Sequence, residues 1–208
     1  MENQASLNRL QIDQLNQRCY DNRADYWDRF PFPEVLPDII HAFAPDSPNR
    51  KVLDVGSGTG KLASWLKKQH YQVLCLDPSE EMVNRCRQKG LECLQTTIQE
   101  YQSQETFSIV LAILSLIHVP KQEMKAQLAK ISSWLPSEGL FVLAMIEGKT
   151  ESIEEKASGY PRFFAKYTDD EIKKLLNNDF DLIFFHRFSG PTTYLLFAFK
   201  KKLIPQSN

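Results

Sequence analysis

The sequence lacks both a long apolar run and an excess of charge of either sign. No hydrophobic stretch approaches the roughly 20 residues that cross a bilayer, and the polar start Met1-Glu-Asn-Gln does not read as a secretory signal. The 25 basic and 26 acidic side chains give a formal net charge of −1, whereas nucleic-acid binding asks for a basic face. We therefore expect a cytoplasmic protein with no membrane or nucleic-acid partner. The one basic cluster, at positions 200–202, is interpreted as a solvated tail.

Cysteine is also scarce, and the chain contains no repeats and no low-complexity linker. The four cysteines, Cys19, Cys75, Cys86 and Cys93, show no paired metal-binding spacing. Cys75 and Cys93 fall in predicted strands, which favours buried free thiols over metal ligands. With 42% hydrophobic residues, a chain of 208 residues can bury a full core. These features predict a single domain over residues 1–208 without a metal.

Three glycines at alternate positions follow a short apolar strand. The segment Lys51-Val-Leu-Asp-Val-Gly-Ser-Gly-Thr-Gly-Lys-Leu-Ala63 places Gly56, Gly58 and Gly60 between that strand and an amphipathic helix. Glycine permits positive φ and lets a ligand approach the main chain closely. The start of the helix adds free N–H groups and the positive end of a dipole. The segment therefore predicts a loop that holds a cofactor.

The spacing of this loop separates two possible cofactors. A dinucleotide fingerprint requires Gly-x-Gly-x-x-Gly, but Lys61 occupies the sixth position counted from Gly56. Asp54, near the strand end, would repel a pyrophosphate and would suit a cationic ligand. The pattern Asp-x-Gly-x-Gly-x-Gly resembles the first motif of the class I S-adenosylmethionine-dependent methyltransferases, whose cofactor carries a sulfonium and an ammonium. An NAD-dependent oxidoreductase is the disfavoured alternative.

The resemblance continues beyond the loop. Asp77 follows the apolar strand 72–76, where a carboxylate can accept hydrogen bonds from ribose hydroxyls of either cofactor. The following Pro-Ser-Glu-Glu-Met matches the family's usual continuation, with Ser79 as a helix N-cap. The resemblance implies S-adenosylmethionine as cofactor and S-adenosylhomocysteine as product. The cofactor-binding residues that it implies are Asp54, Gly56, Ser57, Gly58, Gly60, Asp77, Pro78, Met82, Thr97, Ile98, Leu114, Tyr20 and Tyr26.

Two positions depart from the family's pattern. Thr97 stands where relatives often place an acid that receives the adenine amino group, and Ser108 stands where Asp is common. These departures leave open a second alternative, a non-catalytic module that binds S-adenosylmethionine for regulation or assembly.

The order of predicted elements indicates an α/β fold. In sequence order the predicted elements are β-α-β-α-β-β-α-β-α-β-β, and the last two, the apolar runs 181–188 and 193–199, have no helix between them. Such a pair is a hairpin and needs one antiparallel strand. We predict a doubly wound, mostly parallel seven-stranded sheet with an antiparallel C-terminal hairpin strand and helices on both faces. This is the methyltransferase version of the fold, whereas a nicotinamide-binding domain normally ends on parallel strands.

A histidine follows the fourth predicted strand. The segment Leu114-Ser-Leu-Ile-His-Val119 resembles the corresponding stretch of small-molecule methyltransferases, which implies that His118 acts as a general base or hydrogen-bonds the substrate. A histidine satisfied by backbone groups at the start of a helix is the alternative. The Asn/Asp-Pro-Pro-Tyr and Pro-Cys motifs of other acceptor classes are absent here. We therefore expect methyl transfer to an oxygen or nitrogen of a small-molecule acceptor.

Two segments outside the predicted sheet are candidates for substrate selection. Residues 1–45 are expected to form a helical cap, in which Tyr20, Tyr26 and Trp27 either cover the cofactor or pack as a core face. Residues 147–167 are expected to form a substrate-side loop. Arg162 within it holds an anionic or planar acceptor, or pairs with the loop's glutamates; the sequence leaves both open. We expect a monomer, with a homodimer as the alternative.

Overall fold

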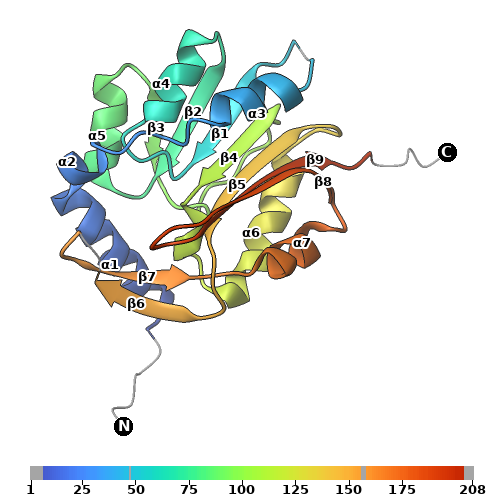
Figure 1. The fold of residues 1–208 in the computed structure, drawn as a ribbon. Coiled ribbons are helices and arrows are strands. Elements are labelled where there is room, and N and C mark those ends of the chain that lie inside the picture. Colours follow the sequence, from blue (N-terminus) through green and yellow to red (C-terminus); the bar gives the residue numbers. More distant parts are fainter. Residues whose placement is uncertain (1–6, 47, 156–157, 204–208) are drawn as a thin grey trace.

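A seven-stranded sheet forms the centre of the computed structural model, which describes residues 7–46, 48–155 and 158–203 (Figure 1). Residues 1–6 of the predicted cap and 156–157 of the predicted loop lie outside the described residues. The strand order is β3-β2-β1-β4-β5-β9-β8, in which β9 pairs antiparallel with both of its neighbours and the other pairs are parallel. The prediction of a mostly parallel sheet with an antiparallel C-terminal hairpin is therefore confirmed. The strands are β1 (Lys51–Val55), β2 (Gln72–Asp77), β3 (Glu92–Gln95), β4 (Ile109–Ile113), β5 (Leu140–Ile146), β8 (Phe180–Phe188) and β9 (Tyr194–Lys201).

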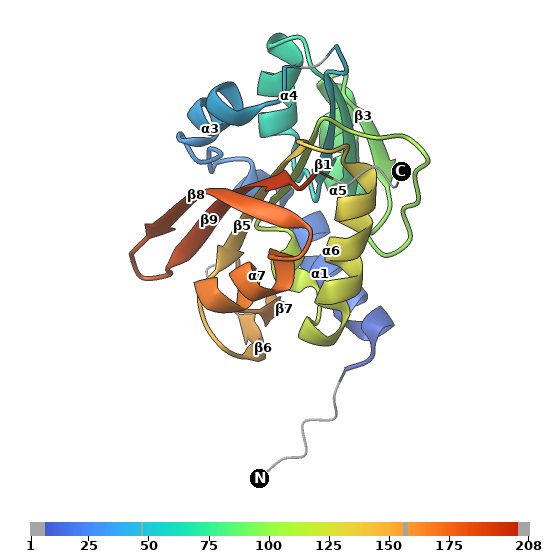
Figure 2. The same cartoon turned by 90° about the vertical axis from the view of Figure 1, so that its right-hand side faces the viewer.

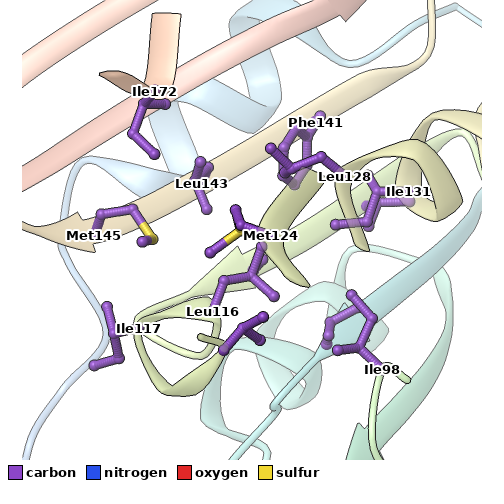
Figure 3. Close-up of a cluster of buried hydrophobic side chains, with 14 of the residues drawn as sticks. Ile98, Leu116, Ile117, Met124, Leu128, Ile131, Phe141, Leu143, Met145 and Ile172 are labelled. Carbon is purple, nitrogen blue, oxygen red and sulfur yellow. The ribbon is translucent and has the colours of Figure 1, made fainter. Parts of the chain in front are cut away.

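Helices cover both faces of the sheet (Figure 2). Strand β5 is buried along its whole length, and its side chains alternate between two hydrophobic clusters. Phe141, Leu143 and Met145 face the first cluster, with α6 (Lys121–Trp134) and α7 (Asp169–Leu176) (Figure 3). Leu140 and Val142 face the second cluster, with α3 (Leu36–Phe43) and α4 (Lys61–Lys68).

Local capping signals position the helices that follow the strands. The Ser79 hydroxyl accepts a hydrogen bond from the Met82 amide and begins α5 (Glu80–Gln88), as predicted. Thr168 and Glu171 form a capping box at the start of α7. No helix within the described ranges is long and apolar enough to cross a membrane.

The N-terminal segment is helical, as expected for a cap. It forms α1 (Arg9–Asn22), α2 (Ala24–Trp27) and then α3. The Asn16 carboxamide oxygen of α1 accepts a hydrogen bond from the Phe163 amide at 2.9 Å. Near the other end of α1, Asp21 accepts a hydrogen bond from the Ser79 hydroxyl at 2.6 Å. Helix α1 is thus attached both to α5 and to the segment after β5.

That segment after β5 was predicted to be a loop, and the prediction was wrong in its local structure. It contains an antiparallel hairpin of β6 (Glu151–Glu155) and β7 (Pro161–Ala165). The two strands form a separate two-stranded sheet beside α1 (Figure 1). Strand β6 alternates exposed and half-buried side chains, which is the period of two expected of a strand. Because most of its residues are charged, this alternation is not visible as a hydrophobic pattern in the sequence.

The basic cluster at positions 200–202 is not a solvated tail, which corrects the sequence interpretation. Lys201 is the last residue of β9, and its ammonium group donates hydrogen bonds to the carbonyl oxygens of Ser132 and Leu135. These carbonyls close the C-terminal turn of α6, where a cation is favourable to the helix dipole. Lys202 likewise donates to the carbonyl of Asn177 after α7. The cluster therefore ties the last strand to two helix ends.

Candidate functional site

A cavity of about 610 Å³ opens at the carboxyl ends of β1, β2 and β4. Its volume lies within the range of about 300–1,000 Å³ that is usual for small-molecule sites, and its place is the ligand crevice of doubly wound sheets. One face of α1 forms a wall of the cavity. The structure brings all but one of the predicted site residues to the lining. These are Tyr20, Tyr26, Asp54, Gly56, Ser57, Gly58, Asp77, Pro78, Met82, Thr97, Ile98, Leu114 and His118.

The glycine loop between β1 and α4 presents its backbone to this cavity. Gly56 has a φ of +72°, and a Cβ on it would lie 2.3 Å from the Cβ of Ser115, so no larger residue fits without displacement. Gly58 has a φ of +56°, but a Cβ there would meet no atom within 4 Å. Because packing does not demand a glycine at position 58, its open side leaves the main chain accessible to a ligand.

Gly60 is the predicted site residue that does not line the cavity. It adopts a φ of +75° at the N-cap of α4. A Cβ on Gly60 would lie 2.6 Å from Cδ1 of Leu91 and 2.8 Å from Sγ of Cys86. Its place indicates a packing role, because the absence of a side chain on Gly60 lets the loop lie close to α5 and to the start of β3.

Replacing Gly60 with alanine is expected to lower the free energy of unfolding by about 2–5 kcal/mol, since a left-handed backbone costs about 1–2 kcal/mol and an overpacked contact about 1–3 kcal/mol. Gly159 is the matched control, because its φ is +71° and a Cβ there would meet no atom within 4 Å. Gly159→Ala should cost about 1 kcal/mol, from backbone strain alone. Urea denaturation of both variants makes the comparison. Equal losses at the two positions would contradict the packing role.

Asp77 joins the glycine loop to the end of β2. Its two carboxylate oxygens accept hydrogen bonds from the Gly58 amide at 2.8 Å and from the Ser79 amide at 2.9 Å. Burial raises the pKa of Asp77 to about 7, although these two bonds pull it down. The carboxylate therefore holds the loop in position and still lines the cavity.

Asp54 is a buried carboxylate that lacks a partner in the part of the chain described. It lies on β1, is 3% exposed, and its side chain makes no hydrogen bond or ion pair with the described residues. Burial raises the pKa of Asp54 to about 7, and the nearby Cys86 and Asp77 add to the rise. A buried acid of this kind is poised to meet a cation from the cavity.

A chain of hydrogen bonds links His118 to the β6–β7 hairpin. Nδ1 of His118 lies 2.7 Å from the carbonyl oxygen of Phe163, so this nitrogen carries the proton. Burial lowers the pKa of His118 to about 3, which leaves the ring neutral and Nε2 an acceptor. The Tyr20 hydroxyl, 2.7 Å away, then donates to Nε2 and accepts from Nη1 of Arg162 at 3.0 Å. One nitrogen of His118 is thus satisfied by a backbone group, as the alternative from the sequence has it, and the role as a general base or substrate contact stays a prediction.

Arg162 lies on β7 and is only 5% exposed. Its guanidinium lies over the rings of Trp27, Phe164 and Tyr20, at 4.6, 4.8 and 5.5 Å from the ring centroids. Within the described ranges it forms no ion pair, so the pairing with the loop's glutamates that the sequence left open is not found there.

Lys61 has a role that sequence reasoning missed. The residue that excluded the dinucleotide fingerprint donates hydrogen bonds to the carbonyl oxygens of Asp28 and Phe30. It thereby ties the start of α4 to the chain after α2. Tyr26 and Phe30 from that segment pack edge to face at 5.0 Å between centroids and line the cavity. No local sequence signal links Lys61 to residues that lie 33 and 31 positions away in the chain.

Leu114 and the two residues that depart from the family's pattern, Thr97 and Ser108, lie in different places relative to the cavity. Leu114 adopts a φ of +56°, uncommon for a residue with a side chain and often found at functional sites. Thr97 lines the cavity, and its hydroxyl donates to the carboxylate of Glu100 at 3.2 Å. Ser108 precedes β4 away from the cavity, where its hydroxyl donates to the Lys51 carbonyl. The Ser108 departure therefore does not alter the cavity.

Three cysteines that are distant in sequence meet behind the glycine loop. The sulfur atoms of Cys75, Cys86 and Cys93 lie within 4.8 Å of one another, and all three residues are buried. Sγ of Cys86 donates to the carbonyl oxygen of Gly58 at 3.2 Å. The described residues add no histidine, cysteine or carboxylate as a fourth ligand to this group. The thiols fill the apolar interface between α5 and the sheet.

Comparison with known proteins gives a family match and a shared fold. Residues 52–139 match the family model for a methyltransferase domain. A search of curated proteins finds no match. The chain is similar to a complex of DhpI with S-adenosylhomocysteine, with a TM-score of 0.71 and 17% identity over 94% of this chain and 99% of that one.

Two further solved structures show the same fold. One is the 1,6-didemethyltoxoflavin-N1-methyltransferase of Burkholderia thailandensis, with a TM-score of 0.63 and 19% identity over 96% of this chain and 93% of that one. The other is the CcbJ methyltransferase of Streptomyces caelestis, with a TM-score of 0.71 and 17% identity over 89% and 98%. The match to a methyltransferase domain over residues 52–139 lies within a fold that these solved structures share with most of the chain.

Proposed function

We propose that the protein transfers the methyl group of S-adenosylmethionine to an oxygen or nitrogen of a small-molecule acceptor. The observation that carries this proposal is the buried carboxylate of Asp54, which has no partner among the described residues and lies beside a glycine loop that is open to the cavity. A dinucleotide would bring a pyrophosphate to this place, which a carboxylate repels. A cofactor with an ammonium and a sulfonium supplies a positively charged partner for the Asp54 carboxylate.

The residues of the cavity fit this cofactor. Asp54 would attract its cationic methionine end, and the open backbone at Gly58 would let that end approach the loop. Asp77, already fixed by two amide hydrogen bonds, would accept from the ribose hydroxyls. Met82 and Ile98 would flank the adenine, and the Leu114 carbonyl would face the ammonium. When bound, the cofactor supplies an electrophilic methyl group on sulfur.

The opposite part of the cavity would hold the acceptor. Methyl transfer depends mainly on aligning an acceptor lone pair with the methyl carbon. The acceptor's proton can pass to the Tyr20 oxygen while the Tyr20 proton moves to Nε2 of His118, along the hydrogen bond already formed. Because the pKa of His118 is low, this transfer becomes favourable only as methylation makes the acceptor acidic.

The proposal extends to partners and location. The net charge of −1 supports an acceptor other than nucleic acid, and we propose a monomer in the cytoplasm, with a homodimer as the alternative. The 1,6-didemethyltoxoflavin-N1-methyltransferase, which shares this fold, has the small molecule 1,6-didemethyltoxoflavin bound in its structure, which supports the same acceptor class.

Calorimetric titration with S-adenosylmethionine, S-adenosylhomocysteine and NAD in parallel tests the proposed cofactor. We expect micromolar binding of the two S-adenosyl compounds and no heat from NAD. A folded protein that binds neither S-adenosyl compound would contradict the proposal, and binding of NAD would support the oxidoreductase alternative. Binding of S-adenosylmethionine without turnover of any acceptor would favour the non-catalytic module.

A further inference from the structure

Arg162 is a cation in the wall of the cavity for which the described residues provide no anion. Its side chain is 5% exposed, and the hydrogen bond from Nη1 to the Tyr20 hydroxyl is the one it makes with the described residues. Nε is buried without a partner there. Burying an unpaired charge costs several kcal/mol, and proteins usually place a carboxylate beside it. The described part of the chain places no carboxylate beside Arg162.

The surroundings of Arg162 hold it in one orientation. Aromatic rings of Trp27 and Phe164 flank the guanidinium and contribute cation–π attraction, which offsets part of the desolvation. Strand β7 is fixed to α1 by the hydrogen bond from the Phe163 amide to Asn16. The fork of N–H groups is therefore preorganised at the edge of the cavity, where less entropy is lost on binding.

The neighbouring hydroxyl does not supply the missing charge. Burial raises the pKa of Tyr20 above its ordinary value, although Arg162 opposes the rise, so Tyr20 keeps its proton at neutral pH. That proton is directed to Nε2 of neutral His118. The group of Arg162, Tyr20 and His118 thus carries a net positive charge in the absence of a ligand.

We propose that Arg162 binds an anionic oxygen group, a carboxylate or a phosphate, of the methyl acceptor. A guanidinium matches such groups with two parallel hydrogen bonds. The cofactor's own carboxylate is the other possible source of the anion. The acceptor is favoured because Arg162 hydrogen-bonds to Tyr20, which in turn hydrogen-bonds to His118, and these are the residues proposed to receive the acceptor's proton. This inference rests on the proposed function and narrows its substrate class.

Benzoate and its neutral analogue benzamide are suitable probes, titrated calorimetrically into the protein saturated with S-adenosylhomocysteine. We expect benzoate to bind at least tenfold more tightly than benzamide. Arg162→Gln should remove this preference, and Arg162→Lys should retain part of it. Arg187→Gln is the matched control, since Arg187 is exposed, pairs with Glu147 and Asp169, and does not line the cavity. This control should keep the full preference.

Three outcomes would overturn the inference. The first is equal binding, or no binding, of the two probes to the unchanged protein, which needs no variant to fold. The second is a preference that survives in Arg162→Gln. The third is a tenfold loss of S-adenosylhomocysteine affinity in Arg162→Gln with unchanged affinity for 5′-methylthioadenosine, which lacks the amino-acid end; the anion would then be the cofactor's carboxylate.

A failure of the proposed function would give a different experimental result from a failure of this inference. The unchanged protein would then bind neither S-adenosyl compound. Benzoate and benzamide titrated into the ligand-free protein would still decide whether Arg162 forms an anion site.

Discussion

Replacing Asp77 with alanine is expected to weaken the binding of S-adenosylmethionine by about 100-fold or more. Hydrogen bonds to a charged acceptor contribute about 1.5–3 kcal/mol each, and the ribose would lose two of them. The Gly58 amide would also lose the carboxylate that positions it. Calorimetric titration at pH 8 measures the change.

The stability of the ligand-free protein should change little in the same variant. The amides of Gly58 and Ser79 lose an acceptor, but the protein also loses a buried carboxylate whose pKa is raised to about 7. These effects have opposite signs. Asp181→Ala provides a control, because Asp181 is exposed on β8 and pairs weakly with Lys202 at 3.7 Å. Unchanged cofactor affinity in Asp77→Ala would remove the ribose assignment.

Replacing Asp54 with asparagine should make the ligand-free protein more stable at pH 8 and a poorer binder of the cofactor. Burial raises the pKa of Asp54 from an ordinary 3.8 to about 7. The stability linked to this group is therefore full below pH 4 and is lost as the pH rises through 7, by at most about 4 kcal/mol. Asparagine never ionises, so the variant should gain about 1–3 kcal/mol over the unchanged protein at pH 8.

Urea denaturation of both proteins at pH 5.5 and pH 8 measures this gain. The advantage of the variant should shrink at pH 5.5, where Asp54 is largely protonated. Asp77, whose pKa is raised likewise, gives both proteins a slope of the same sign and cancels in the difference. We expect the affinity of Asp54→Asn for S-adenosylmethionine to fall at least tenfold. A variant that is less stable than the unchanged protein at pH 8 would contradict the assignment of Asp54 as a strained, unpaired acid.

The parts of the fold that were predictable from sequence carry short-range signals. The strand β1, the three glycines and the helix α4 all lie between residues 51 and 68. The β6–β7 hairpin was missed because its first strand consists mainly of charged residues. Only the packing of β7 against α1 reveals that the opposite side of the hairpin is buried.

The residues of the site likewise divide into those that nearby sequence predicts and those that depend on contacts between distant positions. Residues next to strand ends, such as Asp54 and Asp77, could be placed because parallel strands bring their carboxyl ends to one edge of the sheet. The hydrogen bonds from Arg162 through Tyr20 to His118 join positions up to 142 residues apart, and no spacing rule predicts them. The meeting of Cys75, Cys86 and Cys93 is invisible in the sequence for the same reason.

The attachment of α1 bears on how fast the protein can work. This helix forms a wall of the cavity, yet a few hydrogen bonds connect it to its neighbours, among them Gln17 to the Pro78 carbonyl, Ser79 to Asp21 and Phe163 to Asn16. We expect such an element to open at a lower free energy than the sheet. We expect the residence time of the spent cofactor to follow the detachment of α1. Turnover would then be limited by the detachment of α1 rather than by the methyl-transfer step.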